Sequence, residues 1–464
     1  MSKEAKNKKQ LAAAAQEQEA IPVTGEVDCA SWFVGGKIDE IQFCREFISL
    51  HPMVCVNGQF YTSEGAADQE EIRRLIFLEL SKYVTSGLSR KTDNLLDALK
   101  LFVGIPDLPT ASDAIRLRNG TLRFDGTFIA EAEICRYRLP VRFNPDAAAP
   151  VLWTSFLEEL LEEKDILTLQ EYLGYSLIPS TKGQVMLFLI GEGGEGKSRV
   201  TQVCAKLFGN NMNVSSLHKL EHSEYARADL EQKLLMVDDD LRMSALPSTN
   251  YIKQIVTQEG KIDLERKHAQ SVQREMACRL LCLGNGSPSA LYDHSNGFYR
   301  RQIILTTKPR PVNRVDDPYF AEKLAEEIEG IFLWCFAGLQ RLIANGFHFS
   351  ISDRAKQNLT DLKAIGNNTI LFMESEGYFS AGEDCRTTAA DFYSVYLLWC
   401  RENAEKPVSM RSFSGYLKQN CEKYHIAPSN NIQNRDGRKV RGFAGIKAEV
   451  KTDFMPLEGP SPFE

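Results

Sequence analysis

A glycine-rich stretch with one lysine and one serine is the first place in this sequence where residue types and spacing fit a chemical task. It reads G-E-G-G-E-G-K-S and follows six consecutive apolar residues, 185–190. Backbone N–H groups can surround a polyphosphate only where side chains are small, and a following helix adds its positive N-terminal end. The sequence therefore predicts a phosphate-binding loop made of Gly191, Glu192, Gly193, Gly194, Glu195, Gly196, Lys197 and Ser198.

Two side chains of this loop have predictable roles toward a bound nucleotide. Lys197 would reach the β and γ phosphates of ATP, and the Ser198 hydroxyl would bind Mg²⁺. A chance glycine-rich turn is the alternative, but the residues that follow argue against it. They place apolar side chains at helical spacing before Gly209, at Val200, Val203, Cys204 and Leu207. The pattern predicts a strand, a loop and a helix, with ATP and Mg²⁺ as cofactors.

Three consecutive carboxylates follow the next apolar run. Residues 234–237 predict a buried strand, and Asp238, Asp239 and Asp240 stand at its carboxyl end. A P-loop ATPase holds Mg²⁺ and polarises the attacking water with carboxylates in this position. An acidic strand-to-loop turn without chemistry is the alternative. Because the acids are adjacent, the spacing leaves open which two act, although Asp239 belongs to either pair.

An asparagine and two arginines flank further predicted strands. The run 280–283 predicts a third strand, and Asn285 after it could orient the attacking water, although an Asn-Gly pair is also an ordinary turn. Arg300 and Arg301 precede a strand predicted at 303–305. Such a pair is usually solvated. In a ring ATPase, one of the two would instead reach a neighbouring subunit as an arginine finger that stabilises charge on the transferring phosphate.

A basic tip lies between the second and third predicted strands. Residues 262–268 read I-D-L-E-R-K-H, an amphipathic segment that ends in Arg266, Lys267 and His268. A charged hairpin tip is normally just solvated. Lysine and histidine can both hold a phosphate, lysine as a point charge and histidine as a hydrogen-bond donor. Contact with a DNA backbone is therefore the functional interpretation of this tip.

Two local patterns predict structure upstream of the loop. Apolar residues alternate on both sides of Asn119-Gly120, which predicts a β-hairpin turning at that pair. A helical stripe follows, and its apolar residues fit either ordinary core or a collar that packs between subunits. The stripe comprises Trp153, Phe156, Leu157, Leu160 and Leu161, with a second helix expected to end near Gly174.

Length and composition bound the domain organisation. The chain has 464 residues and a net charge of −7, which allows several domains and argues against nucleic-acid binding by the whole surface. The predicted α/β fold has a P-loop core with a parallel sheet. Its predicted parts are a disordered tail (1–25), an N-terminal α/β region (26–150), a helical collar (151–182), the ATPase domain (183–345), a helical connector (346–380) and a small C-terminal domain (381–464).

The C-terminal part carries a local basic patch. Residues 406–451 contain ten Lys or Arg against three Asp or Glu. Helical stripes and a glycine-punctuated segment at 438–446, which has the look of a hairpin, suit a winged-helix nucleic-acid module. A basic surface for a protein partner is the alternative.

Cysteine usage and hydropathy indicate the cellular compartment in which we expect the protein. Eleven cysteines are scattered without a C-x-x-C pair, so we expect reduced thiols and no zinc site. No stretch approaches the roughly 18 to 20 apolar residues of a membrane span. We expect a soluble protein of the host cell cytoplasm that makes no membrane contact.

Taken in order, these motifs resemble those of superfamily 3 DNA helicases, specifically the poxvirus and satellite-phage type primase-helicases. The resemblance runs from about residue 115 to 450. It rests on R-Y-R-L-P-V-R-F-N-P and the helical region after it, then on G-E-G-G-E-G-K-S, K-L-L-M-V-D-D-D, I-K-Q-I-V-T-Q-E-G-K-I-D-L-E-R-K-H, L-L-C-L-G-N-G-S-P and G-F-Y-R-R. No primase half is visible, so the resemblance favours a helicase without priming activity.

The resemblance implies an AAA+-like core and a role for each motif. The distance to Lys253 favours Asp239 and Asp240 as the working acids, whereas papillomavirus-like relatives favour Asp238 and Asp239. It makes Asn285 the sensor of the γ-phosphate, prefers Arg301 to Arg300 as the finger, and places Lys267 and His268 on a hairpin that grips DNA in a central channel. It also implies a hexameric ring that moves 3′ to 5′.

The predicted function is therefore an ATP-dependent replicative DNA helicase of a phage, virus or mobile element. Expected partners are other copies of the chain in a homo-hexamer, single-stranded DNA in the channel, duplex DNA at the C-terminal domain, and a primase or other replication proteins. The alternative is an origin-binding initiator or helicase loader that uses ATP as an assembly switch. A ring ATPase that remodels proteins is a third, weaker hypothesis.

Overall fold

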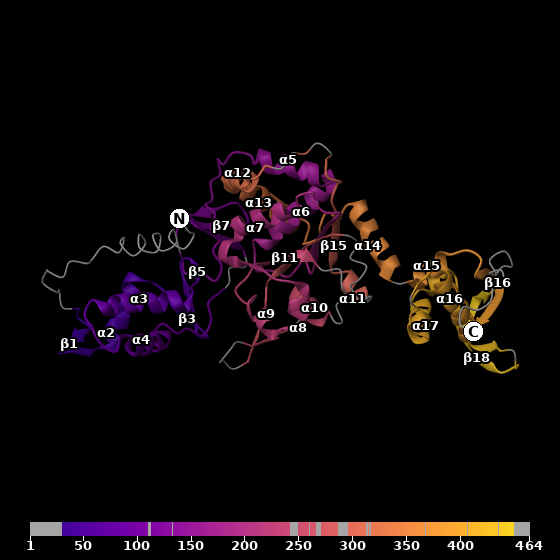
Figure 1. The fold of residues 1–464 in the computed structure, drawn as a ribbon, viewed down its shortest axis with the longest axis horizontal. Coiled ribbons are helices and arrows are strands. Elements are labelled where there is room, and N and C mark those ends of the chain that lie inside the picture. The colour runs from indigo at the N-terminus through magenta and orange to yellow at the C-terminus, as the bar shows by residue number, and fades with distance from the viewer. Residues whose placement is uncertain are drawn as a thin grey trace, which may run out of the picture. The chain divides into compact units, whose positions relative to one another are not determined.

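The computed structural model describes residues 30–449, apart from 110–112, 132, 242–248, 259, 266–270, 286–295, 312–313, 315–316, 367, 406 and 435. The predicted tail 1–25 lies outside the described residues. The chain divides after Leu108 into two compact units, and the site motifs all belong to the second (Figure 1). Among the described residues, no helix is long and apolar enough to cross a bilayer.

The first unit has a small core of its own. Asp39 and Asp68 begin two of its helices by accepting backbone N–H groups with their side chains. The apolar faces of the helices meet in a cluster that includes Trp32, Phe43 and Ile76. The elements are β1 (Phe33–Val34), β2 (Lys37–Ile38), α2 (Glu40–Leu50), β3 (Val54–Val56), β4 (Gln59–Thr62), β5 (Gly65–Ala66), α3 (Gln69–Ser81) and α4 (Leu88–Phe102).

The predicted β-hairpin opens the second unit, with its turn one residue earlier than expected. β6 (Ala114–Leu117) pairs antiparallel with β7 (Gly120–Arg123), which in turn pairs with β8 (Phe128–Ile129). Leu117 lies opposite Gly120, so Arg118 and Asn119 form the turn. The reason is a long-range contact, because the Asn119 side-chain amide both donates to and accepts from the backbone of Phe143.

This hairpin packs with the central sheet of the second unit rather than with the residues before it. Its apolar side chains Ile115, Leu117 and Leu122 belong to the same buried cluster as the central sheet. The region 26–150, which we expected to be continuous, is therefore shared between two units. An alternating pattern reveals that a strand has an apolar face, but it does not reveal which core covers that face.

A five-stranded parallel sheet forms the centre of the second unit. Its strand order is β10-β11-β14-β9-β15, and every neighbouring pair is parallel. Parallel sheets are covered on both faces, which explains the unbroken apolar runs in the sequence. The strands are β9 (Met186–Gly191), β10 (Met212–Val214), β11 (Leu235–Leu241), β14 (Arg279–Asn285) and β15 (Gln302–Thr306), of which β10 has no counterpart in our prediction.

Successive side chains along a strand of the sheet are buried in two separate hydrophobic cores, one on each face. Leu187 and Leu189 of β9 belong to one cluster, and Met186, Phe188 and Ile190 belong to the other. In Figure 1, α5, α6, α7, α12 and α13 lie on one side of the sheet, and α8, α9, α10 and α11 lie on the other. The sheet is thus the middle layer. Its carboxyl edge presents the glycine loop, the three acids and Asn285, whereas Arg300 and Arg301 precede the amino end of β15.

The helices and the small hairpin of this region complete the two layers. The helix predicted after the loop is confirmed, with its four predicted apolar residues buried. The elements are α5 (Val151–Leu160), α6 (Glu163–Ser176), α7 (Ser198–Phe208), the 3₁₀ turn η1 (Gly209–Asn211), α8 (Leu217–His222), α9 (Glu224–Ala228), α10 (Asn250–Thr257), β12 (Ile262–Leu264), β13 (Val272–Arg274), α11 (Asn296–Tyr299), α12 (Phe320–Glu326) and α13 (Ile328–Ala344).

The predicted helical collar is part of this core. All five residues of the stripe that starts at Trp153 are at most 3% exposed and belong to the cluster beneath the sheet. Between core packing and a subunit contact, the structure therefore selects core packing. Helix α6 approaches α13 closely at two glycines, because a Cβ on Gly174 would lie 2.5 Å from the Leu339 nitrogen and one on Gly338 would lie 2.7 Å from the Gln170 carbonyl carbon.

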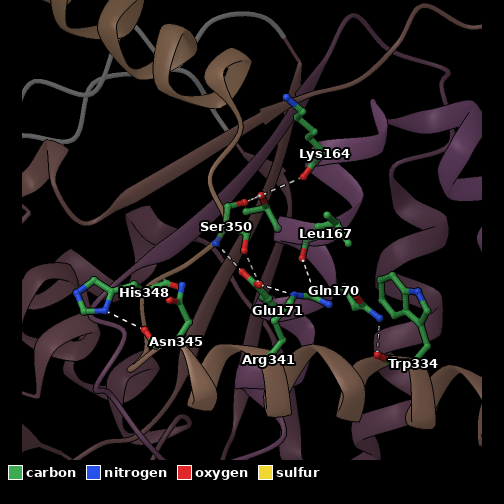
Figure 2. A network of polar contacts seen from close by, with 10 residues as sticks. Lys164, Leu167, Gln170, Glu171, Trp334, Arg341, Asn345, His348 and Ser350 are labelled. Carbon is green, nitrogen blue, oxygen red and sulfur yellow. Dashed lines mark hydrogen bonds and ion pairs between the residues drawn. The ribbon is translucent and has the colours of Figure 1, made fainter.

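A buried carboxylate links α6 to α13 and to the chain beyond it (Figure 2). Glu171 is fully buried and accepts hydrogen bonds from Arg341 Nε at 2.6 Å and from the backbone and hydroxyl of Ser350 at 2.7 and 2.8 Å. Arg341 also donates to the Leu167 carbonyl and to the Gln170 side chain. A buried charge is tolerated when it is paired and fully hydrogen-bonded in this way.

The predicted connector does not form one module. Helix α14 (Asp353–Gly366) packs on β15, and its Leu362 belongs to the sheet cluster that contains Phe188 and Ile190. Helix α15 (Asn368–Glu374) instead contributes Phe372 and Met373 to a separate C-terminal core. That core also holds α16 (Ala389–Glu402), α17 (Met410–Gln419) and an antiparallel sheet in the order β16-β18-β17, with α18 (Cys421–Tyr424) between α17 and β17.

The segment predicted as a hairpin at 438–446 is a single strand. β18 (Lys439–Ala448) pairs with both β16 (Phe379–Thr388) and β17 (Ala427–Gln433), so the hairpin is β17-β18. The glycine that suggested a turn, Gly442, has a different function. A Cβ on Gly442 would lie 2.9 Å from the Cα of Thr388 and 2.9 Å from the Ile432 side chain, so this glycine permits close strand packing.

Candidate functional site

The predicted phosphate loop connects the central strand β9 to α7. Gly193, Gly194 and Gly196 have φ angles of +117°, +84° and +104°, a region that side chains strongly disfavour. Gly191 is constrained by space instead, because a Cβ there would lie 2.7 Å from both Lys197 Nζ and Glu195 Oε1. At each glycine of the motif, a larger residue would therefore be strained or would clash. The loop closes into a small cradle.

A carboxylate of the loop lies inside that cradle. Glu195 is 3% exposed, and its Oε2 accepts a hydrogen bond from Lys197 Nζ at 2.7 Å. Its Oε1 accepts from the backbone N–H of Gly193 at 2.7 Å and from that of Glu192. Burial opposes the charge of Glu195, but the hydrogen bonds from Lys197 and the loop backbone hold its pKa below the usual value. An anion is thus bound by the groups predicted to bind phosphate.

The three consecutive acids at the end of β11 have three different surroundings. Asp238 is 3% exposed and accepts the backbone N–H of Leu217, the first residue of α8, at 2.9 Å. Burial is the main cause that raises the pKa of Asp238. Asp239 instead faces α7 and accepts a hydrogen bond from the Thr201 hydroxyl at 2.5 Å. Asp240 is exposed.

Asn285 lies beside the glycine loop. It ends β14, the strand between β11 and β9, and is in register with Gly191. A Cβ placed on Gly193 would be 3.9 Å from the Asn285 side-chain amide. The structure therefore brings Lys197, Asp239 and Asn285 to one edge of the sheet, from three strands that lie side by side.

The two arginines before β15 differ sharply in exposure. Arg301, which we preferred as the finger, is 5% exposed and donates to the Gly297 carbonyl of the same chain. Arg300 is exposed. Sequence reasoning missed this difference because both residues are equally polar, and only packing of the preceding Phe298 and Tyr299 turns one of them inward.

Two further arginines contact the loop and were not predicted. Arg314 Nη1 donates to the Glu195 carbonyl at 2.6 Å, and Arg310 Nη1 donates to the Gly194 carbonyl at 3.4 Å. Both follow β15 in the segment K-P-R-P-V-N-R, whose only sequence signal was its charge. Their guanidinium groups place positive charge at the rim of the cradle, where a polyphosphate would carry negative charge.

The basic tip predicted at 262–268 is flanked by an observed hairpin. Residues 262–264 pair antiparallel with residues 272–274, and Ile262 and Leu264 point into the core while Asp263 is exposed. Arg266, Lys267 and His268 lie outside the described residues. The hairpin that would carry them is therefore observed, and their contacts remain a prediction.

The C-terminal core carries a wide recess. A groove of about 1350 Å³ lies between the N-terminus of α16, α17 and the β17-β18 hairpin. Its lining is mixed: it includes the apolar Met410 and Phe443, the acidic Asp391 and Asp436, and the hydrogen-bond donors Lys418, Asn430, Asn434 and Arg441. Such side chains can donate hydrogen bonds to an extended anionic partner.

The chain has recognisable relatives at the level of fold. A family described as "Family of unknown function (DUF5906)" matches residues 189–301, a span that includes the glycine loop, the three acids, the basic tip, Asn285 and the arginine pair. The chain is also similar to the apo A form of the NrS-1 C terminal region, with a TM-score of 0.51, 10% identity, and coverage of 88% of this chain and 100% of that one. A second A-form structure of that region, residues 305–718, gives a TM-score of 0.50 at the same identity and coverage. These matches show a shared α/β fold.

Proposed function

We propose that this chain is the ATP-driven motor of a superfamily 3 type DNA helicase, which works as a ring in the replication of a phage, virus or mobile element. One observation carries the proposal. A glycine cradle with a buried lysine, an aspartate held against the next helix and an asparagine beside the loop meet at the carboxyl edge of a parallel sheet. That edge is where α/β proteins bind nucleotides.

The proposed chemistry assigns one task to each residue. Lys197 and the loop N–H groups bind the phosphates of ATP, Asp239 orients and polarises the attacking water, and Asn285 senses the γ-phosphate. Ser198 and Asp239 would hold Mg²⁺, which neutralises developing phosphate charge. Magnesium in such sites needs only one or two protein ligands.

We assign the arginine finger to Arg300. A finger must leave its own subunit to reach the phosphate of the next, and Arg300 is exposed whereas Arg301 is buried on its own chain. We propose that ATP binds between subunits of a homo-hexamer, and that hydrolysis moves the hairpin β12-β13 along one DNA strand. Lys267 and His268 would grip its phosphates, which makes the grip independent of sequence.

The test is strand displacement on forked DNA together with DNA-stimulated ATPase. Lys197→Ala should abolish both activities, because the phosphates lose their cation. The double variant Lys267→Ala and His268→Ala should keep basal ATPase but lose stimulation by DNA and unwinding. Full unwinding by a folded Lys197→Ala protein would rule the mechanism out. A DNA-independent ATPase in the wild type would instead favour remodelling of proteins.

A second candidate function is favoured by the C-terminal groove. The order of α15, β16, α16, α17, β17 and β18, with β18 in the middle of the sheet, suits a winged-helix module whose α17 and hairpin flank duplex DNA. The chain would then act as an origin-binding initiator that uses ATP as an assembly switch. Sequence-specific binding by the full chain without strand displacement would support this function over the helicase.

A further inference from the structure

The phosphate cradle already holds an anion from its own chain. Three donors converge on the Glu195 carboxylate: Lys197 Nζ at 2.7 Å, the Gly193 N–H at 2.7 Å and the Glu192 N–H. Both Glu195 and Lys197 are more than nine-tenths buried, at 3% and 8% exposure. Charge-assisted hydrogen bonds in such surroundings are among the strongest a side chain can make.

We infer that Glu195 is an internal competitor for nucleotide, whose side chain occupies the phosphate cradle and must swing out before the phosphates of ATP can bind. The inference rests on the proposed function, since it concerns the same loop. Lys197 and the two backbone N–H groups that bind Glu195 are the groups that would bind a phosphate. Each backbone N–H is a single donor, and the carboxylate takes the place beside Lys197 that a phosphate would need.

The backbone around Glu195 suits a side chain that leaves while the loop stays. Arg314 holds the Glu195 carbonyl at 2.6 Å and Arg310 contacts the Gly194 carbonyl, so the main chain is fixed independently of the carboxylate. The flanking glycines keep the loop in its cradle conformation at positive φ. Displacement therefore requires only rotation of one side chain, and the loop need not refold.

This competition would set which ligands the loop accepts. A triphosphate carries more negative charge than a diphosphate, so it gains more from the same three donors and displaces the carboxylate more readily. Loss of the γ-phosphate on hydrolysis would then allow Glu195 to return to Lys197 and promote release of the product. Glu195 thus becomes a specificity-determining residue for triphosphate over diphosphate.

The experiment measures binding of ATP, ADP and inorganic tripolyphosphate to the full chain by titration calorimetry. We expect Glu195→Gln to bind tripolyphosphate and ATP about tenfold more tightly than the wild type, because the neutral amide competes weakly for Lys197. The ratio of ATP to ADP affinity should fall, since ADP also gains access to the cradle. Glu195→Gln should also lower the melting temperature of the nucleotide-free protein, because Lys197 loses its buried partner.

Glu192→Gln is the matched control. It removes the same charge from the same loop at an exposed position, so its gain in affinity measures the general electrostatic effect. The competition by Glu195 is measured by how far the gain in affinity of Glu195→Gln exceeds that of Glu192→Gln. Equal affinities in the two variants, or weaker binding by Glu195→Gln while it remains folded, overturn the inference even if ATP still binds the wild type. Failure of ATP to bind wild type and both variants overturns the nucleotide site itself, which separates the two proposals.

Discussion

Asp238, Asp239 and Asp240 are adjacent in the chain but are not equivalent. Their register with β14 shifts between Asp238 and Leu241, a bulge that turns successive side chains away from strict alternation. Asp238 accepts the first backbone N–H of α8, and Asp239 faces the helix that follows the glycine loop. At the scale of single residues, the geometry favours Asp239 as the acid of the proposed nucleotide site.

This assignment predicts that substitution of Asp239 affects ATP hydrolysis and that substitution of Asp238 affects stability. Asp239→Asn should lower ATP hydrolysis by about a hundredfold or more, in the range seen when a group that stabilises a transition state is removed. Asp238→Ala should instead lower the free energy of unfolding by about 1–2 kcal/mol, because the first turn of α8 loses its acceptor. Steady-state ATPase assays and thermal melts of the three variants make the comparison. A larger ATPase loss in Asp240→Asn than in Asp239→Asn would contradict the assignment.

The arginine pair gives a second prediction at the same scale. Arg300→Ala should reduce hydrolysis in the assembled ring by about a thousandfold while ATP binding stays within a factor of two or three, because a finger acts on the transition state of a neighbour. Arg301→Ala should mainly lower the melting temperature, because its guanidinium is buried against the Gly297 carbonyl. ATPase assays on mixtures of Arg300→Ala and Lys197→Ala test the contribution from a neighbour, because two inactive variants can restore activity together only if the finger of one acts on the nucleotide of the other.

At the scale of elements, the approach of α6 to α13 depends on glycine. Gly338→Ala would place a methyl group 2.7 Å from the Gln170 carbonyl carbon, so the two helices would have to separate. We expect a loss of about 1–3 kcal/mol in the free energy of unfolding, as for other overpacked cores. A shift of the thermal or denaturant midpoint measures it.

Gly415→Ala is the matched control for this prediction. Gly415 also lies within a helix, α17, but nothing lies within 4 Å of a Cβ placed there. In a helix interior, alanine is more favourable than glycine by roughly 0.8–1 kcal/mol, so this substitution should leave the free energy of unfolding unchanged or raise it. A similar loss in both variants would show that helix packing is not the cause.

At the scale of the whole molecule, the C-terminal core has its own buried cluster, from Phe372 to Ile446. Removal of residues 368–464 should therefore leave the nucleotide site folded and basal ATPase within about twofold of the full chain, since the buried contacts of the ATPase region stay intact. DNA affinity should fall, and its dependence on salt should weaken, because phosphate contacts release counterions. Binding titrations at two salt concentrations with both proteins test this. Unchanged DNA affinity would assign the basic patch to a protein partner.

The sequence alone determined the strand, loop and helix around Lys197, because six apolar residues, a run of glycines and an apolar helical repeat depend only on local conformation and solvent exclusion. The same reasoning located the strands that carry Asp238 and Asn285. It also indicated buried helices at 151–176, though not which surface covers them. These features are local, so they can be predicted from the periodicity of apolar residues and the spacing of glycines.

Only the tertiary structure decided which polar groups meet. The choice of Asp239 over its neighbours, the burial of Arg301, the contacts of Arg310 and Arg314 with the loop and the presence of Glu195 inside the cradle all depend on residues brought together from distant parts of the chain. A sequence pattern records the polarity of a side chain but not its direction, because that direction is set by packing against elements that lie far away in the chain.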